Sequence, residues 1–490
     1  PAAGLKDVRV ALEPTQGGFR IDTTGQSLLG PFEGTLGLAM PRGGATRIAI
    51  ESFKVSDTAV TGDLTLGQGA VGGDLTLSGG GLDGTVALAP RSGGQGIDVA
   101  LRARNARFGG ATPITIARAT IQGQGTLAGG SSTFSGTARG AGLSYGTLFL
   151  GRFAAQGQVT DGVGHVDASV AGRRASSFAL DLNADIAPRR IAVAARGEWA
   201  GRRIAMPRRA VLTSLESGGW QLAPTQVSYG DGAMIAEGRF GGDDQQLGLR
   251  LARMPLSLLD IAVQDLGVGG TVSGIVNYGR GPGGLPVADV RVLVDDLTRS
   301  GLVLTSKPVD LALVATLTAR DLAARAVFRN DDIRRGRLQA RIADLPGGGD
   351  LVERLRAGSL TAQLRYQGAA ESLWRLAAIE AFDMTGPVAI AANATGTLAD
   401  PRVRGAVSSD ALRIRSALSG TDIRSVRVRG SFEGSRLAIR SFAGKADNGG
   451  DVSGSGIVDL AGLGERVQSG FLQVRGPRLD LRVAARNAHL

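Results

Sequence analysis

Residues 62–88 (GDLTLGQGAVGGDLTLSGGGLDGTVAL) carry one short motif three times. Gly62–Leu66 (GDLTL) returns eleven residues later as Gly73–Leu77 (GDLTL), and more loosely, after the same interval, as Gly84–Leu88 (GTVAL). Within each copy apolar and polar residues alternate, which is typical of a β-strand with one buried and one solvated face. A motif that returns at a fixed short spacing indicates stacked supersecondary units rather than separate globules.

The same alternation recurs in many other segments. Clusters of Gly, Asn, Asp and Pro, such as residues 79–81 and 281–284, separate the segments at short intervals. This pattern predicts an all-β chain, built as an elongated, repetitive and mainly antiparallel β-sheet. We expect the sheet to fold into a long hydrophobic groove that the apolar strand residues line. The predicted lining residues are Leu36, Leu38, Ile48, Ile50, Leu64, Leu66, Leu75, Leu77, Val86, Leu88, Ile97, Val99, Leu101, Val290, Val292, Val294, Val426, Val428, Leu437 and Ile439.

The composition excludes several kinds of functional site. Of the 490 residues 76 are glycine, about twice the usual share, and only 4% are aromatic, so a core built on large rings is not expected. Cysteine is absent, and the only histidines are His165 and His489. These counts remove disulfides, iron–sulfur clusters, thiol nucleophiles and multi-histidine metal sites. We therefore expect no metal and no cofactor.

The basic residues are mostly arginines. The net charge is +11, and only four of the 55 basic residues are lysines. The arginines are spread along the chain and many alternate with apolar residues; the densest group is Arg334-Arg335 with Arg337. Such a distribution favours a solvated outer face over a nucleic-acid site, so we expect no nucleic-acid partner.

Three segments depart from the alternation and predict short helices. Two of them are residues 349–357 and 370–381. The third, residues 255–266, has Pro255 in its first turn and places four apolar residues on one side: Leu256, Leu259, Val263 and Leu266. At about three turns each, these helices are too short to cross a bilayer, and we expect them to cover or plug the sheet.

No sharp change in composition divides the chain. We expect one continuous body with Gly/Thr-rich groove repeats in residues 1–250, a groove with helical insertions in 251–385, and further groove repeats in 386–490. The longest apolar stretch, residues 302–319, contains charged residues, so no transmembrane helix is predicted. Because the sequence starts at Pro1 and not at Met, we expect a fragment or a processed chain, with any anchor or export signal outside it.

One motif is typical of hydrolases. Residues 142–146 (GLSYG) match the nucleophile elbow G-x-S-x-G, and Asp161 and His165 follow Ser144 in the required order. The elbow needs a turn from a strand into a helix, whereas residues 147–151 predict a strand. We expect Ser144, Asp161 and His165 to have no catalytic role, and we expect that the chain is not an enzyme.

A sheet with one apolar face must cover that face. The predicted helices are too few to do so, which leaves two solutions: the sheet folds on itself, or it faces a hydrophobe that is not protein. The candidate lining is almost entirely Val, Leu, Ile, Ala and Gly. This smooth aliphatic lining favours fatty acyl chains over flat or polar ligands.

Four blocks follow one another in the last part of the chain: 396–405 (GTLADPRVRG), 420–423 (GTDI), 432–437 (FEGSRL) and 449–460 (GGDVSGSGIVDL). By these blocks, residues 386–460 resemble the TamB subunits of the translocation and assembly module, within the wider AsmA-like family. Residues 259–274, which end in GTVSG, are similar to another recurring piece of the family. Residues 1–250 resemble the family only in their general composition and strand pattern.

The resemblance implies a periplasmic protein of a diderm bacterium, anchored in the inner membrane through a segment outside this chain. It implies a conduit that moves phospholipid between the two membranes and supports outer-membrane biogenesis. It also implies an outer-membrane barrel partner of the TamA type, bound through regions outside this chain. Two alternatives stay open: a chaperone or scaffold for outer-membrane protein or autotransporter assembly, and a passive β-solenoid adhesin filled by its own side chains.

Overall fold

The computed structural model describes residues 5–486, apart from 68, 92–93, 262–266, 300–306, 331–332, 377–382, 416–420, 448 and 460–477. In the described residues the chain forms 32 strands and only a few short helices, and every described strand pair is antiparallel. The prediction of an all-β, mainly antiparallel chain is confirmed. The chain divides into two compact units, Pro1–Ser214 and Leu215–Leu490.

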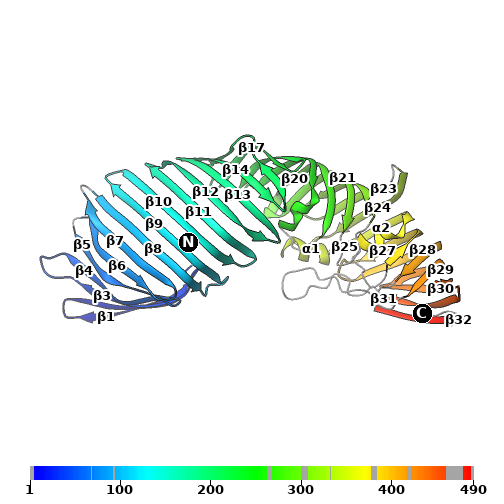
Figure 1. The fold of residues 1–490 in the computed structure, drawn as a ribbon, viewed down its shortest axis with the longest axis horizontal. Helices are drawn as coiled ribbons and strands as arrows, with labels where there is room; N and C mark the ends of the chain where they lie inside the picture. Colours follow the sequence, from blue (N-terminus) through cyan, green and yellow to red (C-terminus); the bar gives the residue numbers. More distant parts are fainter. Residues whose placement is uncertain are drawn as a thin grey trace. The chain divides into compact units, whose positions relative to one another are not determined.

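The first unit contains sixteen strands, most of which follow one another as hairpins. They are β1 (Lys6–Thr15), β2 (Gly18–Ser27), β3 (Gly30–Ala39), β4 (Thr46–Val55), β5 (Thr58–Gly67), β6 (Ala70–Ser78), β7 (Leu82–Arg91), β8 (Gly94–Phe108), β9 (Ile114–Ala128), β10 (Ser131–Tyr145), β11 (Leu148–Thr160), β12 (Val163–Arg174), β13 (Ser176–Ala187), β14 (Arg190–Trp199), β15 (Arg202–Ala205) and β16 (Ala210–Ser214). Figure 1 shows β6 to β13 lying side by side, each strand next to its neighbours in the chain.

The second unit contains the other sixteen strands with two short α-helices and two short 3-10 helices. Its elements are β17 (Trp220–Tyr229), β18 (Gly232–Phe240), β19 (Gln246–Pro255), η1 (Leu256–Ile261), β20 (Val268–Arg280), η2 (Pro282–Gly284), β21 (Pro286–Arg299), β22 (Val309–Leu317), β23 (Leu322–Asn330), β24 (Ile333–Ala343), α1 (Leu351–Ala357), β25 (Ser359–Ala369), α2 (Ala370–Leu376), β26 (Asp383–Thr385), β27 (Pro387–Gly396), β28 (Pro401–Arg415), β29 (Asp422–Gly434), β30 (Arg436–Ala446), β31 (Asp451–Asp459) and β32 (Arg478–Arg486).

Helices form within two of the three predicted segments, as α1 within residues 349–357 and as α2 from Ala370. Helix α1 begins after Asp350. The Asp350 side chain accepts a hydrogen bond from the Glu353 backbone N–H (2.8 Å), and the Glu353 side chain accepts one from the Asp350 backbone N–H (3.1 Å), a reciprocal N-terminal cap. The prediction for residues 255–266 needs correction. Pro255 ends β19, Leu256–Ile261 form a 3-10 helix, and Leu259 is exposed. Residues 262–266, with Val263 and Leu266, lie outside the described residues, as do residues 377–381.

β-Bulges keep the strands in phase where the pairing shifts. Between β19 and β20, Leu251 pairs with Gly274 and Met254 with Val272, so one strand advances three residues while the other advances two. In a regular strand Met254, three residues after Leu251, would point to the opposite side of the sheet, and the bulge returns it to the same side. Arg253, inside this bulge, takes a left-handed φ of 45°, as does Asp296 (φ 54°) in a corresponding bulge of β21.

The end of β8 contacts the hairpin turns of earlier strands of the first unit. β8 is fifteen residues long, whereas β7 has ten, and its last part bends at Asn105 (φ 52°). This part lies against the hairpin turns of earlier strands. The Arg104 N–H donates to the Gly81 carbonyl (2.7 Å), and the Gly109 N–H donates to Ser56 Oγ (3.2 Å), which itself donates to the Leu29 carbonyl. These backbone groups, at the ends of the strands and in the turns, therefore find hydrogen-bond partners within the unit.

The repeated motif of β5 and β6 pairs with itself. Asp63 lies opposite Asp74, which places Gly62 opposite Leu75 and Gly73 opposite Leu64. Both glycines have positive φ, 148° and 135°, and a Cβ on either would lie 2.0–2.1 Å from a carbonyl oxygen of the facing strand. Only glycine allows this close approach, which explains why the motif begins with it.

Replacing Gly73 by alanine should loosen this pair of strands. The added Cβ would meet the Asp63 carbonyl oxygen at 2.0 Å, so Gly73→Ala should cost about 1–3 kcal/mol of local stability. The measurement is amide hydrogen exchange of β5 and β6. Gly67→Ala is the control, because its Cβ would meet nothing closer than 3.9 Å. Equal exchange in both variants would contradict this account of the motif.

Candidate functional site

One side of the first unit is continuously apolar. Residues that face each other across two strands lie on the same side of the sheet, and here the facing residues are apolar from strand to strand. Ile21 faces Leu36, Leu36 faces Ile50, Leu75 faces Val86, and Val86 faces Val99. This apolar face contains all thirteen lining residues predicted between positions 36 and 101: Leu36, Leu38, Ile48, Ile50, Leu64, Leu66, Leu75, Leu77, Val86, Leu88, Ile97, Val99 and Leu101.

The second unit has an apolar face of the same kind. Val292 faces Leu313, and the pairing continues strand by strand to Val407, Gly430 and Ile439. The seven remaining predicted residues all lie on it: Val290, Val292, Val294, Val426, Val428, Leu437 and Ile439. The register thus places each predicted residue on an apolar face. That a ligand lies there stays a prediction.

The two apolar faces differ in how far they are covered. In the second unit, Leu351 and Leu355 of α1 and Leu373 of α2 pack against it, and Val426 is fully buried. In the first unit the face consists mainly of half-buried side chains, and no described helix lies there to cover it. Several of its apolar residues are plainly exposed, among them Leu66 (38%), Ile121 (41%), Leu127 (43%) and Phe134 (42%). An aliphatic face this open to water is a typical place for an apolar partner.

Ile121, Leu127 and Phe134 were missed from the sequence. Gly123 and Gly125 interrupt the apolar alternation of β9, and Gly136 interrupts that of β10. The available signal was the other half of the pattern, because Gln122, Gln124 and Thr126 alternate regularly as polar residues.

Phenylalanine rings lie over glycines of the next strand. A Cβ on Gly125 would lie 2.5 Å from the Phe134 ring, and one on Gly34 would lie 2.3 Å from the Phe53 ring. The glycines therefore make room for rings that lie along the apolar face. The face keeps a low relief, which suits a chain-like ligand better than a compact one.

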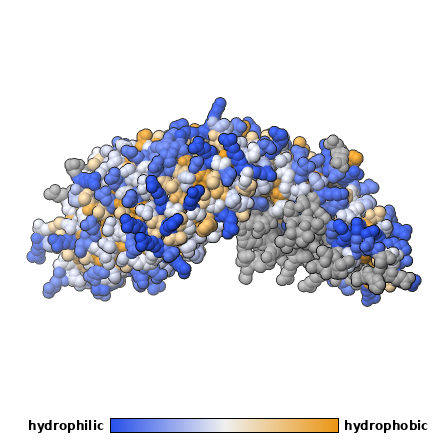
Figure 2. Space-filling view, in the orientation of Figure 1, coloured by the Kyte–Doolittle hydropathy of each residue, from blue (hydrophilic) through white to orange (hydrophobic). Residues whose placement is uncertain are grey.

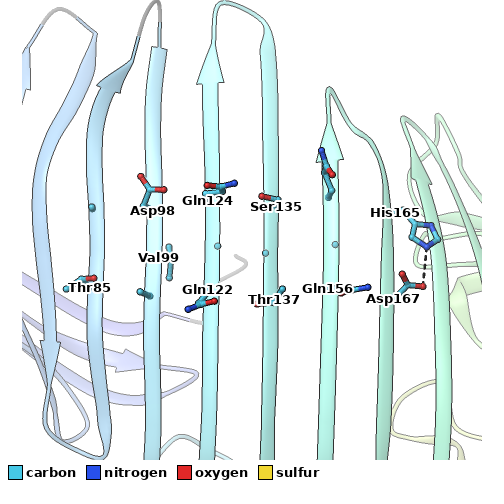
Figure 3. Close-up of a pocket in the computed structure, with 16 residues that line it drawn as sticks. Thr85, Asp98, Val99, Gln122, Gln124, Ser135, Thr137, Gln156, His165 and Asp167 are labelled. Carbon is cyan, nitrogen blue, oxygen red and sulfur yellow. Dashed lines mark hydrogen bonds and ion pairs between the residues drawn. The ribbon is translucent and has the colours of Figure 1, made fainter.

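The opposite side of the first unit is polar. A shallow cavity of about 750 Å³ lies on it. Figure 3 shows the residues that line this cavity, which come from successive strands, β7 to β12. Glutamines and hydroxyls line the cavity, among them Gln122, Gln156 and Thr137, together with Val99 and several glycines. Figure 2 shows that hydrophilic residues cover much of the visible side of this unit, with smaller apolar areas between them.

His165 lies at one end of this cavity, in a charged cluster. Its Nδ1 is 2.7 Å from Asp185 Oδ1 and its Nε2 is 3.2 Å from Asp167 Oδ1. The hydrogen bonds with Asp185 and then Asp167 raise the pKa of His165 above its ordinary value. Asn183 Nδ2 donates to Asp167 (2.6 Å), which holds the pKa of Asp167 below its usual range. Arg209 forms an ion pair with Asp185 at 3.1 Å.

The hydrolase-like motif is not assembled. Ser144 faces Phe149 and His165 faces Gln158, and these two partners are nine residues apart along β11, roughly 30 Å. Asp161 accepts a hydrogen bond from the Ser132 backbone instead. Among the described residues, no group of three or more His, Asp or Glu side chains could hold a metal ion.

Within the same part of the chain, no helix is long and apolar enough to span a membrane. Comparison with protein-family models and with curated proteins finds no match. The candidate functional surfaces are therefore the two faces described above.

The His165 cluster should make stability depend on pH. The folded state raises the pKa of His165. Its contribution to the free energy of unfolding is therefore complete below the pKa of the unfolded state, about 6.5, and is lost as the pH rises through the pKa of the folded state. His165→Gln should therefore lower the melting temperature more at about pH 5.5 than at about pH 8.5. A difference between wild type and variant that does not change with pH would contradict the ion-pair account. His489 is present in both proteins, so its effect on the melting temperature cancels in this comparison.

Proposed function

We propose that the apolar face binds phospholipid acyl chains and that the chain is part of a periplasmic conduit for phospholipid between the inner and outer membranes. The observation that carries the proposal is the uncovered apolar face of the first unit, continuous from Ile21 to Val99 and beyond. The conduit would support outer-membrane biogenesis.

The chemistry of the lining matches that of an acyl chain. Removing a chain from water is worth about 0.8 kcal/mol per methylene, so on the order of 20–25 kcal/mol for the two chains of a phospholipid. A face as aliphatic as the bilayer interior makes the exchange nearly neutral, because the chain leaves one apolar surroundings for another. Leu64, Leu75 and Val86 supply such surroundings on adjacent strands. The polar headgroup would stay in water at the open side of the face.

The compartment and the partners come from the resemblance of residues 386–460 to the AsmA-like family. On that basis the chain lies in the periplasm and is held at the inner membrane by a segment outside it. A barrel of the TamA type in the outer membrane is the proposed partner at the other end.

A passive adhesin would use its strands differently. A solenoid that serves only as a spacer fills its interior with its own side chains, which are then buried and dry. The apolar face of the first unit carries exposed residues such as Phe134 and Leu127, which supports a binding role over a purely structural one. A scaffold for unfolded outer-membrane strands would act through strand edges, and its crosslinks would map to edge strands.

A charge on the apolar face should block lipid binding and spare the fold. Leu75 is half-buried, between Gly62 and Val86. In Leu75→Arg the side chain can extend its guanidinium to water along the open face, so the strands should stay folded. Acyl chains passing that point cannot avoid the charge. We expect severalfold less phospholipid per chain, measured by mass spectrometry after incubation with phosphatidylethanolamine vesicles.

Asp74→Arg is the matched control. Asp74 is the neighbouring residue on the polar side, exposed and opposite Asp63, so an arginine there faces a carboxylate. Its lipid content should equal that of wild type. Equal lipid content in both variants would reject the proposed conduit.

A further inference from the structure

Five arginines gather on the polar face of the first unit although they are far apart in the sequence. Arg102 and Arg104 lie on β8, Arg118 on β9, Arg139 on β10 and Arg152 on β11. Together they line a second cavity of about 770 Å³. The register explains the gathering, since Arg104 faces Arg118 directly, while Arg102 and Arg139 both face the Thr120 position between them.

The lining of this cavity contains no carboxylate; its other members are Ala, Gly, Ser, Thr and Phe. In the described part of the chain none of the five forms an ion pair, although Arg20, Arg91, Arg196 and Arg209 of the same unit do. The nearest carboxylate by register is that of Asp83, opposite Arg102. Like charges directly opposite on neighbouring strands destabilise a sheet, so the Arg104–Arg118 pair has a cost that no described contact offsets.

We propose that this cluster, the arginine site, binds clustered phosphate groups, either those of an anionic lipid surface or those of a soluble polyphosphate. Guanidinium groups match phosphate oxygens with paired, charge-assisted hydrogen bonds. Facing strands are about 4.8 Å apart and alternate residues of a strand about 6.6 Å, so two or three of these side chains can reach one phosphate. The site is on the opposite side of the sheet from the apolar face, and it does not depend on acyl-chain binding there.

The position within the sheet disfavours a peptide. The strands β8 to β11 are each paired on both sides, so an acidic segment could not add itself as a further strand and would have only side-chain contacts. The composition of the lining disfavours single-stranded nucleic acid, which is held mainly by stacking on aromatic rings. Phe153 is the one aromatic residue in this lining, and it packs into the cluster of Ala103, Ala106 and Phe108.

The test compares the 490-residue chain with Arg104→Gln/Arg118→Gln. Arg139 is left unchanged because it also borders a neighbouring cavity that contains Asp167 and Asp181. Tripolyphosphate should bind wild type, and the double variant should bind it at least about tenfold more weakly by calorimetry. The variant should melt no lower than wild type, because a like-charge pair has been removed; a purely structural role would lower its melting temperature. Arg42→Gln/Arg47→Gln removes the same charge from exposed positions elsewhere in the unit and should bind as wild type does.

Vesicles separate the two sources of phosphate. Sedimentation with phosphatidylglycerol vesicles that depends on Arg104 and Arg118, and is absent with phosphatidylcholine vesicles, would identify a lipid surface. Tripolyphosphate binding without vesicle binding would identify a soluble polyphosphate.

Loss of binding to the same extent in the control variant would overturn the proposal, since net charge alone would then explain it. A 20-nucleotide DNA strand that binds far more tightly than tripolyphosphate would overturn it in favour of nucleic acid. None of these experiments measures the lipid content of the apolar face. The proposal of the arginine site can therefore be rejected without rejecting the proposed conduit.

Discussion

Two rules of strand geometry determine this structure. Along each strand, side chains alternate strictly between the two sides of the sheet, and residues that face each other on neighbouring strands lie on the same side. A register error of one residue would move every apolar side chain of that strand to the polar side. Across the described strand pairs the apolar residues stay together, from Ile21 facing Leu36 to Leu437 facing Val458. Where the pairing shifts, as between Leu251 and Met254, a bulge restores the phase.

Small residues allow the strands to keep this register. Gly62 and Gly73 let the backbones of β5 and β6 approach more closely than any side chain would permit, and Gly125 makes room for the ring of Phe134. The high glycine content therefore follows from a sheet that must stay regular and smooth over many strands. The two sides are then free to differ, with aliphatic side chains on one and arginine, glutamine and carboxylate side chains on the other.

The sequence predicts the strands and their faces well, because alternation is a local property. All twenty predicted lining residues, from Leu36 to Ile439, lie on an apolar face. What the local pattern could not supply is the register between neighbouring strands. Arg104 and Arg118 meet only because β8 and β9 are in one particular register, and His165 meets Asp185 for the same reason. The helix predicted over residues 255–266 was wrong at its start, because Pro255 ends β19 and Leu256–Ile261 form a 3-10 helix.

The most direct test of acyl-chain binding is photocrosslinking with a diazirine amino acid placed at consecutive positions of one strand. Positions 85 to 88 of β7 alternate between the polar face (Thr85, Ala87) and the apolar face (Val86, Leu88). With phospholipid vesicles present, acyl-chain binding at the apolar face predicts lipid adducts, identified by mass spectrometry, at Val86 and Leu88 and few at Thr85 and Ala87. Adducts of equal yield at all four positions, or none at Val86 and Leu88, would contradict it.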